Sequence, residues 1–484
     1  MEPIQTEILI LGAGPGGYTA AFYAADLGKK VLLVEQDKKL GGVCLNRGCI
    51  PSKALLHAAK MIVEARESAH RGITFGPPQI ELDKLRAWKN AVVEKLAAGV
   101  SFLAQKRGVQ VLTGRGYFEN SQTLRIETTE GQQFVNFDKA IVAVGSNAAL
   151  PKTFDLGNPR VMTSTEALEI EEVPQDLLVV GGGYIGMELG SVYANLGSKV
   201  VVVELLDSIL SGADPDLVRP VFKWAEANFR ELRFQTKVTH MATKGKKILV
   251  ATEGPDKKPR EELFDRVLVS VGRVPRCRDL GLENTKVEQD DRGFIKVNDR
   301  QQTADPALLA IGDIAGGVLL AHKAAMEGRI AVETIVGEPS SSAGIIIPAV
   351  VFTEPELAWC GLTEAEAKAR AIPVEIAKFP WAASGRAQTF DHPAGLTKLI
   401  IDSETERLLG VGIVGHGAGE LIAEGVVVVE MGGSVRDLAE SVHPHPTLSE
   451  TIMEAAESFY GHSTHTISPK KHDDSEAGAA PKTP

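Results

Sequence analysis

Close to its N-terminus, at positions 8–17, the chain reads ILILGAGPGG, and this stretch decides the fold. Four apolar residues predict a buried strand, and Gly12, Gly14 and Gly17 form a G-x-G-x-x-G loop before an alanine-rich helix. Such a loop lets the backbone approach a pyrophosphate at the N-terminus of the helix. A second apolar run at 31–35 ends in Glu35, where an acid can bind a ribose hydroxyl. This order predicts a dinucleotide-binding α/β unit.

The same arrangement occurs a second time. An apolar run at 176–180 leads into another glycine loop, and a later run at 200–203 is followed directly by an acid. The four counterparts each lie 169 positions after their equivalents, and they are Gly181, Gly183, Gly186 and Glu204. This register indicates an internal repeat, so the chain is predicted to contain two dinucleotide-binding units.

Glu204 indicates which nucleotide the second unit binds. A carboxylate at this place hydrogen-bonds a free 2′-hydroxyl and repels a 2′-phosphate. Basic residues are sparse just after it, where positions 205–208 read LLDS. We therefore expect NAD rather than NADP at the second unit.

A pair of cysteines follows the first unit, in the run GGVCLNRGCIPSK at 41–53. Cys44 and Cys49 have four residues between them, so they can close a small disulfide ring that is easily reduced. The other cysteines, Cys277 and Cys360, are isolated, which excludes a disulfide scaffold. No metal site is expected, because the local sequence offers zinc no further ligands. The alternative is two ordinary buried cysteines, but a dithiol beside a cofactor loop favours electron transfer.

The third constellation is SVHPHPTLSE at 441–450. Thr447 and Glu450 fit a capping box that would open a helix over 448–460, so one interpretation gives Glu450 only a capping role. Thiol chemistry, however, requires a base near neutral pH, and histidine is suited to that task. A nearby carboxylate would orient the histidine ring and stabilise its charged form.

Composition excludes several classes of protein. The chain has 484 residues, of which 44% are hydrophobic and 24% charged, enough for three or four globular domains. A net charge of −11 argues against a nucleic acid partner, and no apolar run is long enough to span a membrane. No signal peptide is visible, and we expect a reducing, cytoplasmic location, although an organelle matrix is not separated from it.

The motif GGxCLNxGCIPSK closely resembles the redox-active disulfide of the flavin-dependent pyridine-nucleotide disulfide oxidoreductases, and the resemblance extends over about residues 5–460. Val43 and Arg47 depart from the commonest wording, and Arg47 could alter the charge near the thiolates. The resemblance implies FAD on the first unit, against a Cys44–Cys49 disulfide, and NAD on the second. It also implies that His445 is the base and Glu450 its orienting acid.

Further cofactor-binding residues follow from the same resemblance. Lys53 and Glu188 would pair near the flavin and nicotinamide rings, although surface solvation is the usual role of such residues. Asp313, at the end of an apolar run at 307–313, would bind the ribityl chain of the flavin. The remaining expected cofactor-binding residues, several at strand ends that could be simple turns, are Gly116, Ser146, Gly272, Arg273 and Gly312.

The predicted fold is α/β, with two Rossmann-like domains and a C-terminal α+β dimerisation domain. The predicted segments are an FAD-binding domain (1–150), an NAD-binding domain (151–274), a central segment completing the FAD domain (275–345), an interface domain (346–462) and a flexible tail (463–484). The resemblance further implies a homodimer in which one chain lends His445 and Glu450 to its partner's disulfide.

Within the family, the chain most resembles members that oxidise protein-bound dihydrolipoyl groups with NAD, which implies the same activity here. The partner would be a lipoyl-bearing protein of a 2-oxo acid dehydrogenase complex, the glycine cleavage system or another lipoate-dependent pathway. Glutathione-type reductases are disfavoured by Glu204, and mercuric reductases by the lack of a C-terminal cysteine pair. A non-catalytic flavoprotein is disfavoured because both cysteines and the His445–Glu450 pair are present.

Overall fold

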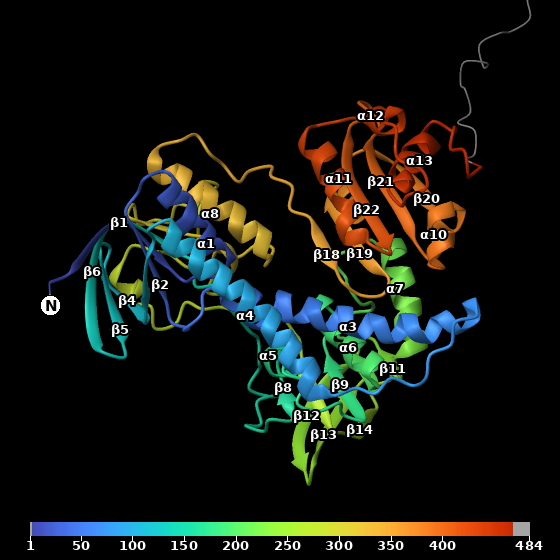
Figure 1. Ribbon diagram of the computed structural model, residues 1–484, viewed down its shortest axis with the longest axis horizontal. Helices are drawn as coiled ribbons and strands as arrows, with labels where there is room; N and C mark the ends of the chain where they lie inside the picture. The colour runs from blue at the N-terminus through green and yellow to red at the C-terminus, as the bar shows by residue number, and fades with distance from the viewer. Residues whose placement is uncertain (1, 468–484) are drawn as a thin grey trace, which may run out of the picture. The chain divides into compact units, whose positions relative to one another are not determined.

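The computed structural model describes residues 2–467, which form two compact units (Figure 1). Unit 1 contains residues 2–209 and 228–345, and unit 2 contains Leu210–Ala227 and 346–467. Most of the predicted tail, residues 468–484, lies outside the described residues. Among residues 2–467, no helix is both long enough and apolar enough to cross a bilayer.

The first sheet of unit 1 has seven strands in the order β3-β2-β1-β6-β5-β4, with β17 also paired to β6. Strands β1, β2, β3, β6 and β17 are parallel, whereas β4 and β5 add an antiparallel extension to β6. The strands are β1 (Ile4–Leu11), β2 (Val31–Glu35), β3 (Gln110–Thr113), β4 (Arg115–Asn120), β5 (Thr123–Thr128), β6 (Gly131–Val142) and β17 (Leu308–Ala310).

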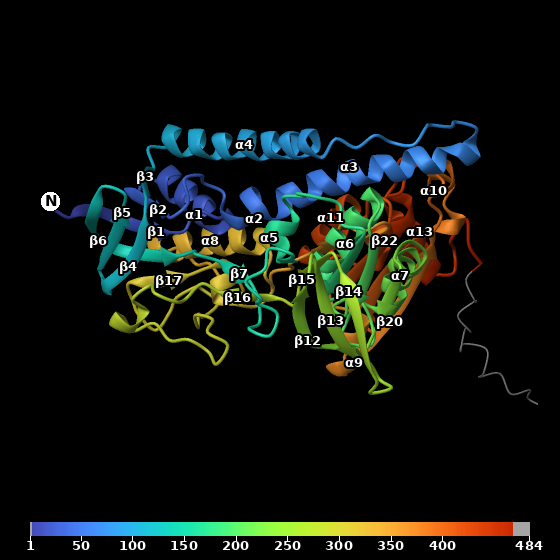
Figure 2. The ribbon, with the colours of Figure 1, turned by 90° about the horizontal axis from the view of Figure 1, so that it is seen from below.

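Helices cover this sheet. Helix α1 lies beside α8, although some 300 residues separate them in the sequence, and both are visible together in Figure 1. Helix α4 runs along α2 and α3, as Figure 2 shows. The helices and short 3₁₀ turns are α1 (Pro15–Asp26), α2 (Gly42–Arg47), α3 (Cys49–Glu67), η1 (Ser68–Arg71), α4 (Leu82–Lys106), η2 (Leu282–Asn284), η3 (Gly312–Ala315) and α8 (Ala321–Val336).

The second sheet of unit 1 repeats the first. Its five parallel strands follow the order β11-β10-β9-β15-β8, which matches β3-β2-β1-β6-β17 position by position. These elements are β8 (Val161–Met162), α5 (Ser164–Ala167), β9 (Asp176–Val180), α6 (Tyr184–Leu196), β10 (Lys199–Val203), β11 (Glu231–Arg233) and β15 (Arg266–Val269). The internal repeat read from the sequence is therefore a repeat of topology for four strands, whereas the fifth strand differs, because β8 precedes β9 in the chain and β17 follows β6.

Two small sheets complete unit 1. A three-stranded antiparallel sheet follows β11, and a two-stranded ribbon joins β7 to β16. The ribbon brings the two predicted strand-end motifs side by side, because Pro275 pairs with Ser146 and Arg273 with Ala148. The strands are β7 (Ser146–Ala148), β12 (Lys237–Lys244), β13 (Lys247–Glu253), β14 (Pro259–Phe264) and β16 (Arg273–Pro275).

Unit 2 is built on a five-stranded antiparallel sheet of order β18-β19-β22-β21-β20. Its core includes Trp381, which is fully buried against helices α11 and α13 and the sheet. The elements are α7 (Pro215–Asn228), β18 (Ala349–Val351), β19 (Glu356–Gly361), α9 (Glu364–Ala369), β20 (Val374–Pro380), η4 (Trp381–Ala383), α10 (Gly385–Phe390), β21 (Leu396–Asp402), β22 (Leu408–Gly415), α11 (Ala418–Glu430), α12 (Val435–Glu440) and α13 (Glu450–Phe459). The predicted mixed α/β class is confirmed.

Candidate active site

A cavity of about 1260 Å³ lies within unit 1. The loop after β1, helices α2 and α3, and the ends of several strands form its wall. Of the predicted site residues, those lining it are Gly12, Gly14, Glu35, Cys44, Cys49, Lys53, Gly116, Ser146, Glu188, Arg273, Gly312 and Asp313. Gly17, Gly181, Gly183, Gly186, Glu204 and Gly272 lie elsewhere in unit 1. The fold thus gathers residues from widely separated segments around one space.

The glycine loop before α1 has no room for a side chain at Gly12 or at Gly17. Gly12 adopts a φ of +102°, and a Cβ there would lie 2.5 Å from the carbonyl oxygen of Ala143. A Cβ on Gly17 would lie 1.8 Å from the carbonyl oxygen of Gly12. Helix α1 begins at Pro15, and its N-cap Gly14 brings no side-chain acceptor to the first-turn N–H groups. This arrangement fits a pyrophosphate at the helix N-terminus.

The second loop reproduces the first in detail. Gly181 has a φ of +107°, and a Cβ on it would lie 2.5 Å from the carbonyl oxygen of Ser270. A Cβ on Gly186 would lie 2.1 Å from the carbonyl oxygen of Gly181, the same obstruction that Gly17 meets. The residues therefore fit a second dinucleotide.

The acids of the two units make equivalent hydrogen bonds. The carboxylate of Glu35 accepts the N–H of Ala13 at 2.7 Å on one oxygen and that of Asp37 at 3.0 Å on the other. The carboxylate of Glu204 accepts the N–H of Gly182 at 2.6 Å and that of Leu206 at 2.8 Å. All these partners keep the 169-residue offset. Each acid therefore holds its own glycine loop, a role that the sequence did not reveal.

A second polar cluster lines the cavity. The hydroxyl of Ser146 donates to the carboxylate of Asp313, and the guanidinium of Arg273 donates to Ser146 Oγ at 2.6 Å. Arg273 Nε also lies 3.5 Å from Asp313. Asp313 lies in the 3₁₀ turn η3, just beyond the strand that was expected to carry it. The three residues form one network, so neither Ser146 nor Asp313 is a simple turn residue.

The cysteine pair joins two helices. Cys44 lies in α2, and Cys49 is the first residue of α3. Both are thiols in the structure, with Cys44 partly buried and Cys49 exposed. A hydrogen bond from Cys44 and the positive charge of Lys53 together lower the pKa of Cys49 to about 7, against the opposing effect of desolvation. The same hydrogen bond, together with burial, raises the pKa of Cys44. Cys49 is therefore the better thiolate of the pair.

Lys53 and Glu188 form an ion pair beside the cysteines. Lys53 Nζ lies 2.7 Å from the Glu188 carboxylate, which also accepts the hydroxyl hydrogen of Ser52 at 3.1 Å. The side chain of Glu188 is 4% exposed, so the pair is a built feature rather than a surface contact. Lys53 lies within α3, in its second turn.

Arg47 pairs with an acid instead of changing the charge near the thiolates, as its position had suggested. Its guanidinium lies 2.6 Å from the carboxylate of Asp37, at the edge of the cavity near Glu35. The charges that change the pKa of Cys49 are those of Lys53 and Glu188. Asp37 therefore balances Arg47.

The predicted base lies in unit 2, just before α13. His445 Nδ1 lies 2.8 Å from one oxygen of Glu450, and the other oxygen accepts the N–H of Thr447 at 2.7 Å. The His445 ring is 72% exposed. Only half of the expected capping box forms, because the Thr447 hydroxyl donates to the carbonyl of Pro444 and α13 begins at Glu450. Glu450 thus caps the loop and orients the ring at the same time.

His443, the other histidine of the 441–450 stretch, is a positioning residue. Its Nε2 lies 2.8 Å from Glu424 in α11, and its Nδ1 contacts the carbonyl oxygen of Ser441 at 2.9 Å. Only 8% of its side chain is exposed. The two histidines of the motif therefore differ, since His443 anchors the loop and His445 is presented to solvent.

A buried chain of hydrogen bonds fixes the start of α13. Trp381 Nε1 donates to Thr397 at 2.9 Å, Thr397 donates to Thr451 at 2.8 Å, and Thr451 donates to the carbonyl of Leu448 at 2.7 Å. All three donor side chains are buried. The chain links the sheet of unit 2 to the turn that carries Glu450.

These geometries define an oxidoreductase with a thiol pair beside a dinucleotide cavity, and comparison with known proteins agrees. Residues 6–328 match the pyridine nucleotide-disulphide oxidoreductase family, and residues 347–456 match the dimerisation domain of the same family. The chain belongs to this family of oxidoreductases, as the sequence motifs indicated.

Its relatives narrow the class further. The chain is 46% identical over 460 residues to the dihydrolipoyl dehydrogenase of Vibrio parahaemolyticus, covering 95% of this chain and 97% of the relative. It is 46% identical over 461 residues to that of Haemophilus influenzae, with 95% and 96% covered. It is 41% identical over 466 residues to that of Haloferax volcanii, with 96% and 98% covered.

Solved structures share the fold. LpdA from Mycobacterium tuberculosis has a TM-score of 0.87 at 27% identity, covering 94% of this chain and 99% of that one. The HOCl-induced flavoprotein disulfide reductase RclA from Escherichia coli has a TM-score of 0.82 at 26% identity, covering 92% and 98%.

Proposed function

We propose that this protein oxidises protein-bound dihydrolipoyl groups to the cyclic disulfide, with NAD⁺ as the final electron acceptor. The observation that carries the proposal is a thiol pair of unequal acidity, Cys44 and Cys49, in the wall of a dinucleotide cavity. Near-complete alignment with dihydrolipoyl dehydrogenases at 46% identity supports this substrate over glutathione or mercuric ion.

Two cofactors fit the residues present. The cavity with its Gly12 loop, the Ser146–Arg273–Asp313 network and the cysteines suits FAD, and the Gly181 loop with Glu204 suits NAD. Bound FAD would supply the redox chemistry that couples the thiols to the nicotinamide. Lys53 and Glu188 would lie at its reacting end, since both line the cavity beside Cys49.

The thiol steps follow from the acidities of the two cysteines. A substrate thiolate attacks Cys44 of the oxidised pair, the Cys44–Cys49 bond breaks, and Cys49 leaves as a thiolate held by Lys53. The second substrate thiol then attacks the mixed disulfide, which releases the lipoyl disulfide and reduced Cys44. A pKa of about 7 makes Cys49 a good leaving group at neutral pH. The electron pair gained by the cysteines ends as hydride on NAD⁺.

His445 would remove the proton from the substrate thiol. Its ring is exposed, its Nδ1 is held by Glu450, and its Nε2 is the nitrogen that remains for the substrate. We propose that the protein is a homodimer in which His445 of one chain serves the Cys44–Cys49 pair of the other, a proposal that the match to a dimerisation domain supports.

The natural partner would be a lipoyl-bearing protein in a reducing compartment such as the cytoplasm. A 2-oxo acid dehydrogenase complex, the glycine cleavage system and other lipoate-dependent systems all present the same dihydrolipoyl chemistry. A pull-down with lipoylated proteins would identify which of them is served.

The test is to add dihydrolipoamide and NAD⁺ to the purified flavin-loaded protein and to follow the appearance of NADH. Cys44→Ser and Cys49→Ser should each abolish this reaction while flavin stays bound, because the pyrophosphate loop is separate from the thiols. Absorbance of the bound flavin checks its retention. Near-normal turnover in either variant would rule out the disulfide mechanism.

A further inference from the structure

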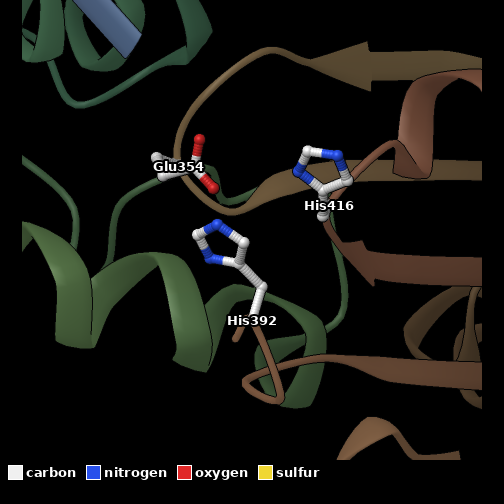
Figure 3. A group of neighbouring side chains, drawn as sticks. All are labelled: Glu354, His392 and His416. Atoms are coloured by element: carbon white, nitrogen blue, oxygen red, sulfur yellow. The ribbon is translucent and has the colours of Figure 1, made fainter. Parts of the chain in front are cut away.

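A cluster of metal-binding side chains lies in unit 2. Glu354, His392 and His416 each present one ligand atom, and these atoms lie within 4.8 Å of one another (Figure 3). In that view the carboxylate of Glu354 and the two imidazole rings form the corners of a triangle. All three side chains are partly buried. We propose that this cluster is a binding site for a divalent late first-row transition ion, with Zn²⁺ as the ion to test.

The sheet topology brings the three ligands together. Strands β19 and β22 pair antiparallel with Glu356 opposite Gly415, so the turn before β19 meets the loop after β22. Strands β22 and β21 pair with Val414 opposite Leu396, which brings the loop before β21 to the same end. Three loops far apart in the sequence, at 352–355, 391–395 and 416–417, therefore converge.

The scaffold around the ligands is fixed by several contacts. The carboxylate of Glu356 accepts the N–H of Gly419 at 3.0 Å, which ties the Glu354 turn to α11. The rings of His392 and His416 are nearly parallel, with centroids 5.5 Å apart and an interplanar angle of 8°. His416 also packs against Phe390 at 4.9 Å. The two imidazoles are thus held beside each other before any ion binds.

The chemistry of the donors selects the class of ion. Two imidazole nitrogens and one carboxylate oxygen suit Zn²⁺, Cu²⁺, Ni²⁺ or Fe²⁺, whereas Ca²⁺ and Mg²⁺ prefer all-oxygen sites. Ligand atoms around tetrahedral zinc lie about 3.3 Å apart, so a separation of up to 4.8 Å closes by small side-chain rotations. Three protein ligands leave a further coordination position for water or an external ligand.

Zinc binding to the flavin-loaded holoenzyme tests the proposal. A Cys44→Ser, Cys49→Ser background removes the dithiol, which would otherwise compete for zinc. Calorimetric titration with ZnCl₂, with elemental analysis after dialysis, should then give one ion per chain. His392→Ala and His416→Ala should each weaken binding by at least about tenfold, because even outer-shell changes cost that much. Glu354→Gln should weaken it in the same direction.

The control is His240→Ala, which removes an exposed histidine of β12 in unit 1 and should leave zinc affinity unchanged. Thermal unfolding provides a second measurement. Zinc should raise the melting temperature of the background protein but not that of a His392→Ala, His416→Ala double variant. If the background protein binds no zinc, or if the histidine variants bind it equally well, the cluster is a packing arrangement of two rings and a carboxylate, and the proposal is wrong.

Discussion

At the scale of single residues, the most consequential feature is the difference in acidity between the two cysteines. The pKa of Cys49 is about 7, whereas that of Cys44 is raised. In the reduced protein, alkylation of Cys49 should therefore increase with pH around a midpoint of about 7, while Cys44 should react only at higher pH. Lys53→Met should raise the Cys49 midpoint, because it removes the positive charge that stabilises the thiolate. Peptide mass spectrometry distinguishes the two sites.

The matched control for that experiment is Lys246→Met, a charge removal at an exposed turn between β12 and β13. It should leave the alkylation profile unchanged. Preferential alkylation of Cys44, or an unchanged midpoint in Lys53→Met, would contradict the assigned roles.

The sequence identified many of these residues because they belong to short local motifs. The spacing within the GxGxxG loops and between the paired cysteines indicates their function. Cys44, Cys49 and Asp313 all line the cavity. The pairing of Arg47 with Asp37 and that of His443 with Glu424 were not predicted. These contacts join segments whose proximity arises only when the sheets have formed.

The zinc-type cluster was missed for the same reason. His392 and His416 are 24 positions apart, and Glu354 precedes His392 by 38, so no metal-ligand spacing is visible in the chain. Only the antiparallel register of β19, β22 and β21 reveals them as neighbours.

At the scale of elements, the residues just after β10 are expected to set the nucleotide preference. Glu204→Ser combined with Leu205→Arg should shift the preference toward NADP⁺ by about tenfold or more. A carboxylate that repels the 2′-phosphate is lost, and a guanidinium that can donate hydrogen bonds to it is gained. Leu205 is 67% exposed, so arginine fits there. The ratio of kcat/KM values for the two nucleotides measures the shift.

Glu261→Gln, an exposed change on β14, serves as the control and should not alter the preference. An unmodified protein that already prefers NADPH would show that the second nucleotide site has been misinterpreted.

Unit 2 depends on a buried cation that joins α7 to the sheet. Lys398 Nζ lies 2.8 Å from Asp214 and 3.0 Å from Asp216, and its side chain is 1% exposed. Lys398→Met should lower the free energy of unfolding by about 3–5 kcal/mol, because it leaves a buried carboxylate unpaired. Urea denaturation of the variant and the parent measures the difference.

Lys378→Met offers a matched control, since Lys378 contacts the same Asp216 at 2.7 Å but is 42% exposed. It should lower the free energy of unfolding by no more than about 1 kcal/mol.

The stabilising effect of Lys398 should also depend on pH. Despite its burial, Asp216 has a lowered pKa because Lys378 and Lys398 pair with it. Its contribution is therefore present above its unfolded pKa of 3.8 and is lost as the pH falls through the lower folded value. Equal losses of unfolding free energy in Lys398→Met and Lys378→Met would contradict the proposed difference between the buried and the exposed lysine.

The elements themselves were predicted well where periodicity is strong and less well at their ends. The apolar runs at 8–11 and 176–180 lie in β1 and β9 as expected. Helix α13 begins at Glu450 rather than at Leu448, because Thr447 uses its hydroxyl on the carbonyl of Pro444 instead of capping the helix. Helix ends depend on such single hydrogen bonds, which composition does not show.

At the scale of the whole molecule, the shared-site proposal makes a prediction of its own. Cys44→Ser and His445→Ala homodimers should each be inactive, but dissociating and reassociating the mixture should restore activity. In a heterodimer, one site would collect both substitutions and the other would combine an intact Cys44 with an intact His445. Activity near one quarter of the wild-type level is expected for random mixing, since about half the dimers are mixed and each has one intact site.

Dihydrolipoamide:NAD⁺ turnover before and after reassociation provides the measurement, and a mixture of two differently tagged Cys44→Ser chains is the control that should stay inactive. A verified heterodimer without activity would show that each site is built from a single chain.

The duplicated carboxylates have an evolutionary consequence. Because Glu204 holds the N–H groups of Gly182 and Leu206, it is bound to the backbone before any nucleotide arrives. A lineage drifting toward a phosphorylated nucleotide cannot simply discard this acid, since the loop would lose both acceptors in the same step. The effect of a substitution that admits the phosphorylated nucleotide therefore depends on other substitutions that restore the hydrogen bonds of the loop. The first half of the repeat is constrained in the same way, because Glu35 accepts the equivalent pair of N–H groups.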